Sequence, residues 1–202
     1  MFLFTYSASA QKIYSTEQRR CNLKISQKIP TDVATLLDQS LEFLANIKGT
    51  KGSRAHRKLF GGTVSGETYC SFLEKNIYSI GYSLTSSDVF ASNFGGSVLL
   101  SDQVLQKDYI VLASALLHEA LHTNYGSHVK CPSNKGEKLK GKNACDNKAL
   151  SSYGSHYIFA KNLEKHCLNC SATEIESSLE LGNHALKRII GLDSRIRLRL
   201  GY

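Results

Sequence analysis

The sequence predicts one mostly helical α+β domain, with a small sheet just ahead of a buried helix. Apolar residues recur at helical spacing over 31–47, and residues 108–117 are apolar nearly all round, as in a helix that crosses a core. Residues 80–101 are rich in β-branched and aromatic residues with Gly-Gly punctuation, and 97–101 fit a buried strand. The 202 residues, 42% of them hydrophobic, suit a single core.

The first part of the chain carries two further helix signals. Thr31 or Asp32 is expected to cap the first helix, and Gly49 to end it. Residues 48–58 are a basic stretch with glycine and are expected to form a loop. A second helix is expected over 67–80.

The second part also predicts helices. The apolar helix from 108 onward should end near Gly126, because glycine commonly follows the last helical residue. Another helix is expected over 155–163. A capping box at 173–176 opens a further helix, which a glycine at 182 or 191 interrupts.

Residues 116–128, LLHEALHTNYGSH, hold three of the seven histidines of the chain. A helix places His118 and His122 one above the other on one face, because they are four residues apart. Neutral imidazoles are good zinc ligands, and two of them one turn apart can take two corners of a tetrahedron. Glu119 lies beside them, where a carboxylate can take a proton from water. The pattern predicts a zinc-dependent hydrolase; the alternative is two core histidines and a solvated glutamate.

The HEALH motif at 118–122 resembles the active-site helix of the zincin metallopeptidases, and His128 stands where the metzincin branch has its third histidine. The resemblance implies Zn²⁺ held by all three histidines, and Glu119 as the general base in cleavage of a peptide or protein substrate. It also implies that the sheet ahead of the helix pairs its edge strand with the substrate. The chain departs from that branch at Tyr125, where the branch has glycine, and has no methionine after Met1.

A looser resemblance links residues 145–154 to the aspzincin branch, in which an aspartate is the third ligand and a tyrosine assists the reaction. Asp146 and Tyr153 would take those roles here. Glu164 is a further candidate ligand, because several zincins recruit a downstream glutamate. The third ligand is therefore assigned to His128, with Asp146 and Glu164 as alternatives. The other histidines are expected to be ordinary surface or core residues: His56, His156, His166 and His184.

The even number of cysteines is compatible with three disulfides. The six are Cys21, Cys70, Cys131, Cys145, Cys167 and Cys170. A bridge from Cys131 to Cys145 would close the lysine-rich loop after His128 and hold His128 and Asp146 near the metal. The C-x-x-C at 167–170 allows a tight bridge, a redox pair, or half of a four-thiolate zinc site. Cys21 and Cys70 would then form the third bridge, by elimination.

Residues 1–10 are apolar and end in Ala-Ser-Ala, which resembles the end of a secretory signal followed by a mature chain from Gln11. We therefore expect residues 11–202 to form one catalytic domain that is secreted or periplasmic. No apolar run approaches the roughly 18 residues of a transmembrane helix, so no membrane span is expected.

The chain carries a formal charge of +8, with Lys and Arg densest at 48–58, 130–148 and 195–199. None of these clusters has the interleaved aromatics of a nucleic-acid module, so no specific nucleic acid is expected. Arg and apolar residues alternate over 195–200, as in a terminal strand or a basic tail. Two other functions fit the sequence: an inactive zincin-like protein that binds a partner, and a disulfide-stapled basic binding module.

Overall fold

The computed structural model describes residues 21–83 and 90–191 and confirms the α+β class. The predicted leader at 1–10 and the terminal strand or tail at 195–200 lie outside these residues. The described helices are α1 (Thr31–Asn46), α2 (Arg54–Leu59), α3 (Gly66–Asn76), α4 (Tyr109–Tyr125), α5 (Ser152–His166) and α6 (Ala172–Leu186). The strands are β1 (Ser79–Tyr82), β2 (Ala91–Phe94), β3 (Ser97–Leu100), β4 (Val129–Lys130) and β5 (Asn143–Cys145). Short 3₁₀ helices cover Asp102–Gln106 and Ser133–Lys135.

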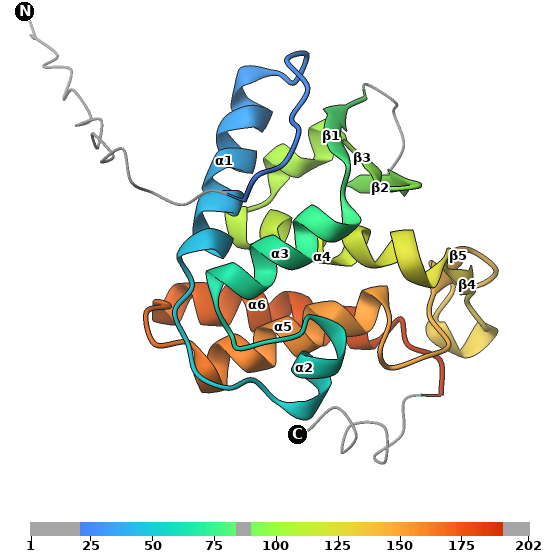
Figure 1. Cartoon of the computed structure of the whole chain (residues 1–202). Helices are drawn as coiled ribbons and strands as arrows, with labels where there is room; N and C mark the ends of the chain where they lie inside the picture. Colours follow the sequence, from blue (N-terminus) through green and yellow to red (C-terminus); the bar gives the residue numbers. More distant parts are fainter. Residues whose placement is uncertain (1–20, 84–89, 192–202) are drawn as a thin grey trace, which may run out of the picture.

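Helix α4 is the central element of the fold. It packs against α1, α3 and β2 on the side of the sheet and against α5 and α6 on the other (Figure 1). Asp108 caps its start by accepting a hydrogen bond from the N–H of Val111 at 2.8 Å, and Gly126, with φ 76°, follows its last residue. The predicted buried helix and its end at Gly126 are therefore confirmed. Its apolar faces include Leu112, Leu116 and other fully buried side chains, which fixes the helix in the core.

The three-stranded sheet has the order β1-β3-β2. β1 is parallel to β3, and β2 is antiparallel to it across a turn at Gly95 and Gly96, both of which have positive φ. β2 is the edge strand next to α4: Asn93 donates from its amide to the Glu119 carbonyl and to Thr123 Oγ1. A small sheet thus precedes the central helix, as the sequence predicts, and its edge strand lies against the HEALH segment.

Three sequence predictions in the first half of the chain need correction. The residue before α1 is Pro30, and no side chain caps the helix; Thr31 already lies in its first turn. The last part of the loop expected over 48–58 belongs to α2 instead, because Ser53 accepts a hydrogen bond from the N–H of His56 at the start of that helix. The helix expected over 67–80 ends at Asn76, and the chain continues into β1.

The capping box of helix α6 lies two residues before the predicted one at 173–176. Ser171 accepts from the N–H of Glu174 at 3.2 Å, and the Glu174 carboxylate accepts from the N–H of Ser171 at 2.6 Å. Gly182 does not interrupt α6. A Cβ there would stand 3.1 Å from the Cα of Tyr157, so glycine lets α6 approach α5 closely.

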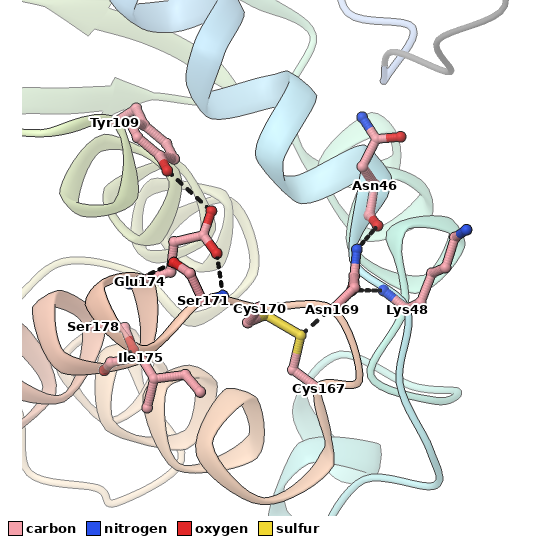
Figure 2. Close-up of a disulfide and its surroundings, with 10 residues drawn as sticks. All are labelled: Asn46, Lys48, Tyr109, Cys167, Asn169, Cys170, Ser171, Glu174, Ile175 and Ser178. Atoms are coloured by element: carbon pink, nitrogen blue, oxygen red, sulfur yellow. Dashed lines mark hydrogen bonds between the residues drawn. A yellow bond between two sulfur atoms is a disulfide. The ribbon is translucent and has the colours of Figure 1, made fainter.

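All six cysteines are paired in three disulfides: Cys21–Cys70, Cys131–Cys145 and Cys167–Cys170. These pairings leave no thiolate for a four-cysteine zinc site. The last bridge joins the end of α5 to the start of α6 (Figure 2). Between its cysteines, Asn169 accepts from the N–H of Lys48 at 2.7 Å and donates to the carbonyl of Asn46 at 2.8 Å, which holds the end of α1 against this loop. No helix within the described ranges has the length and apolarity to cross a membrane.

Candidate metal centre

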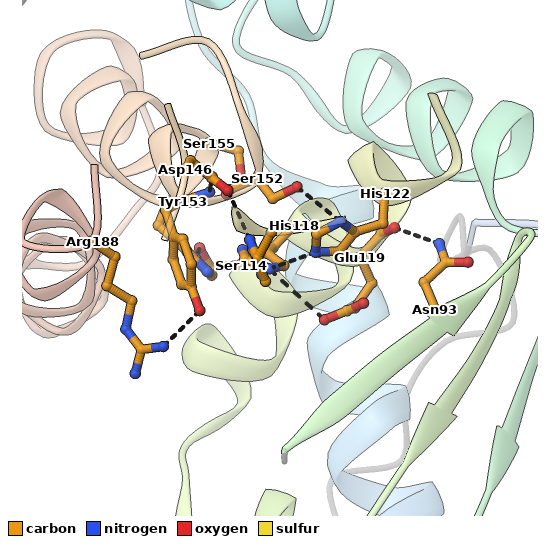
Figure 3. A network of polar contacts seen from close by, with 12 residues as sticks. Asn93, Ser114, His118, Glu119, His122, Asp146, Ser152, Tyr153, Ser155 and Arg188 are labelled. Carbon is orange, nitrogen blue, oxygen red and sulfur yellow. Dashed lines mark hydrogen bonds and ion pairs between the residues drawn. The ribbon is translucent and has the colours of Figure 1, made fainter. Parts of the chain in front are cut away.

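Three imidazoles converge at the C-terminal end of α4. His118 and His122 come from successive turns of the helix, and His128 comes from the chain just after Gly126. One nitrogen of each ring can be chosen so that all three lie within 4.8 Å of one another, a group that could hold a metal ion. The Nε2 atoms of His118 and His122 face each other at 3.1 Å (Figure 3). The helical repeat therefore produces the predicted pair, and the turn after α4 adds the third ring.

The ring orientations of His122 and His128 favour metal binding. Nδ1 of His122 donates to the carbonyl of Gly126 at 2.7 Å, and Nδ1 of His128 donates to Asp146 Oδ1 at 2.7 Å. Each bond fixes the ring and leaves the lone pair on Nε2 for an ion. The second oxygen of Asp146 accepts from the N–H of Tyr153 at 2.8 Å, so the carboxylate is itself held in place.

The surroundings of His118 and His122 favour their neutral forms. Burial lowers the pKa of His118 well below its ordinary value, and the neighbouring His156, His122 and His128 lower it further. A hydrogen bond with the backbone of Ser152 acts in the opposite direction. Burial also lowers the pKa of His122, although its bond to the Gly126 carbonyl acts in the opposite direction. Because a neutral imidazole is the form that binds metal, both rings are ready to act as ligands near neutral pH.

The pKa of the Asp146 carboxyl lies below its ordinary value. Burial alone would raise it, but hydrogen bonds from His128, from the N–H of Tyr153 and from Ser151 stabilise the charged form more strongly. The carboxylate therefore stays ionised behind His128.

Glu119 is buried beside the cluster, with 7% of its surface exposed. Its Oε1 lies 4.0 Å from Nε2 of His118, and no protein cation lies close enough among the described residues to form an ion pair with it. Burial alone raises the pKa of its carboxyl to about 8. Such a carboxyl can both accept and release a proton near neutral pH.

The cluster opens into a groove of about 820 Å³. Its floor is α4, one wall is the edge strand β2 with Asn93, and the opposite wall is the end of α6 with Arg188 (Figure 3). His118, Glu119 and the other two histidines of the cluster all line this groove. Residues of β2 and the three histidines therefore line the same groove.

Two residues at the site were not expected from the sequence. His156 on α5 is buried against His118, with ring centres 4.8 Å apart, and its Nδ1 bonds to Ser114 Oγ at 2.7 Å. Burial lowers the pKa of His156 to about 3. Arg188 donates to the phenol oxygen of Tyr153 at 2.6 Å. Neither contact has a local signal in the sequence, because each joins residues that are distant along the chain.

The other sequence candidates occupy different places. Asp146 is not in the three-residue group but orients His128 from behind. Glu164 pairs with Lys161 at 2.7 Å on α5 and is also outside the group. His56 lies in the core against Tyr69, as expected. His184, expected to be an ordinary residue, lines the groove.

The donor set fits a metal ion. Three imidazoles leave one corner of a tetrahedron open, and this arrangement is typical of catalytic rather than structural zinc sites. Comparison of the chain with protein-family models, with curated proteins and with solved structures finds no match.

Proposed function

We propose that the chain is a zinc-dependent peptidase of the zincin type, with Zn²⁺ held by His118, His122 and His128. The observation that supports this most strongly is the convergence of three imidazoles, two with Nδ1 already bonded, next to a buried carboxylate. The chemistry that zinc supplies in such a site is acidification of a water molecule and polarisation of a substrate carbonyl. The residues of the chain supply the proton transfers and the positioning.

Glu119 is the general base in this proposal. A bound dication would favour its carboxylate form, and burial keeps its proton affinity high enough to take a proton from water. The same carboxyl then gives the proton to the nitrogen of the departing amine. Because Glu119 follows His118 in the helix, it needs no separate element to reach the site.

The groove walls position the substrate. Among the described strands β2 is the edge of its sheet, so its outer main-chain groups are placed to bond to an extended peptide. Tyr153 lines the groove, and its oxygen already accepts from Arg188. The phenol hydrogen is therefore available to donate to the oxygen of the carbonyl under attack.

The proposal includes export of the chain, outside the cell or to the periplasm. Three disulfides support it, because such bridges persist in oxidising compartments. The chain from Gln11 onward would be the mature enzyme, with one catalytic domain.

The experiment that tests the function compares Glu119→Gln with the wild type. The amide keeps the shape but removes the base, so bound zinc should remain while peptide cleavage falls by about 10²–10⁴. Glu164→Gln, an equivalent change on the outside of α5, is the control and should leave both unchanged. Full cleavage activity in Glu119→Gln would overturn the assigned role, and a zinc-loaded wild type that cuts no peptide would favour a binding protein.

A further inference from the structure

Positive side chains outnumber negative ones along the groove beside the metal centre. Two side chains with permanent positive charge line it, Lys107 and Arg188, and Glu119 is its one carboxylate among the described residues. Glu119 lies with the histidines on the groove floor, so the rest of the described lining has no negative charge. His184, exposed on α6, adds a group that can also bear positive charge. The groove therefore complements negative charge on whatever lies along it.

Arg188 is fixed in place at both ends. Its main-chain carbonyl accepts from the N–H of Asp146 at 2.9 Å, so the end of α6 is tied to the segment that orients His128. Its guanidinium donates to the Tyr153 oxygen at 2.6 Å and lies 4.9 Å from the centre of that ring (Figure 3). The side chain is therefore held in one orientation at the groove wall before any ligand binds.

No carboxylate in the described ranges forms an ion pair with Arg188. A guanidinium has five N–H donors in a planar fork, and among the described residues only one bond, to Tyr153, uses them. The side chain is half-buried, where an unpaired charge costs more than it does in open water. The remaining donors match the two oxygens of a carboxylate, which arginine binds through two parallel hydrogen bonds.

The distance from Arg188 to the metal centre suits a neighbouring residue of the substrate. The Tyr153 ring centre is 4.9 Å from the Arg188 guanidinium carbon and 4.4 Å from the centre of the His128 ring. The guanidinium is thus within about 10 Å of His128, a span that two or three residues of extended chain cover.

We propose that Arg188 forms a subsite that binds a carboxylate of the peptide substrate, within about three residues of the bond that is cut. The inference rests on the proposed peptidase function and names its substrate class. The carboxylate comes either from an Asp or Glu side chain or from the end of the substrate chain. Lys107, further along the groove, adds attraction for acidic substrates without fixing their position.

The test uses the zinc-loaded chain and mixtures of random octapeptides in matched pairs. One pair differs only in Glu against Gln, and a second only in a free against an amidated C-terminus. Mass spectrometry gives the ratio of kcat/KM between the members of each pair, which cancels differences in folding or zinc content between variants. The wild type should prefer the carboxylate member of one pair by about 10- to 100-fold, the range expected for a charged hydrogen-bonded contact.

Arg188→Gln should bring that ratio close to one, and Arg188→Lys should restore part of it. Lys187→Gln removes the same charge from an exposed neighbour outside the groove, so it should keep the wild-type ratio. Fluorescently labelled members of each pair should show the same preference in binding to zinc-loaded Glu119→Gln, in which cleavage is blocked. The pair that responds tells whether the carboxylate is internal or terminal.

Cleavage without a carboxylate preference would overturn this inference and leave the peptidase function standing. A preference that survives Arg188→Gln would also overturn it, because another residue would then form the subsite. Absence of both cleavage and binding for every peptide would overturn the peptidase function together with the inference.

Discussion

Asp146 accepts a hydrogen bond from Nδ1 of His128 at 2.7 Å, so the two candidates for third ligand act as a pair. The aspartate holds the ring through Nδ1, which leaves Nε2 as the nitrogen that could bind a metal ion. The backbone N–H of Tyr153 holds the aspartate in turn. The sequence leaves these two residues as alternative third ligands. In the structure, His128 belongs to the group that could hold a metal ion, and Asp146 contacts it from outside that group.

Asp146→Asn should leave one zinc per chain but weaken its affinity by about 10- to 100-fold, as expected when the partner of a ligand histidine is changed. His128→Ala removes the ligand itself and should lower the affinity further. Zinc titration against a competing chelator measures both. If His128→Ala kept its zinc and Asp146→Asn lost it, Asp146 would be the ligand.

The disulfide Cys131–Cys145 closes a loop next to His128 and ends on β5, one residue before Asp146. Replacing both cysteines by serine should reduce the free energy of unfolding by about 3 kcal/mol, from the entropy of a loop of this length. Zinc affinity should fall as well, because the segments that carry His128 and its partner lose their anchor.

The paired control is Cys167→Ser with Cys170→Ser, which opens a bridge of sequence separation 3 between α5 and α6. Its zinc affinity should stay at the wild-type value, measured by the same titration. Equal zinc affinity in both double variants and the wild type would show that the loop bridge does not support the site.

The lowered pKa of His56 predicts that the folded chain loses stability in acid. Burial lowers its pKa from 6.5 to about 4 in the folded chain, with His166 and Arg57 acting in the same direction. As the pH falls below 6.5, the unfolded chain binds a proton that folded His56 does not accept until about pH 4. The folded state should therefore lose about 3 kcal/mol across that window through this residue.

Urea unfolding at pH 7 and pH 4.5 measures the effect. His56→Gln should show a smaller difference between the two pH values than the wild type does. His184→Gln, which changes an exposed histidine, should keep the wild-type difference. Equal pH dependence in all three proteins would remove His56 as a cause.

The features that the sequence predicted are local ones. The period of α4 and the four-residue spacing of His118 and His122 depend on one helix, so the pattern alone places both rings on one face. The start and end of that helix were also predicted, because Asp108 and Gly126 affect only the helical turn next to them. Glu119 followed from the same segment.

The features that the sequence missed depend on packing between distant segments. His156 reaches His118 only because α5 crosses α4, and Arg188 reaches Tyr153 only because the end of α6 bonds to the chain at Asp146. Gly182 suggested an interruption of its helix, yet contact with α5 makes glycine suitable there. No local pattern contains these contacts.

The most direct test of the metal centre is the zinc content of the purified chain after dialysis, measured by elemental analysis. We expect one zinc per chain in the wild type, and loss of zinc in His118→Ala, His122→Ala and His128→Ala. His184→Ala, which changes a histidine of the same groove outside the cluster, should keep its zinc. A wild type without stoichiometric metal, or zinc content unchanged in all three cluster variants, would contradict the metal site and the function built on it.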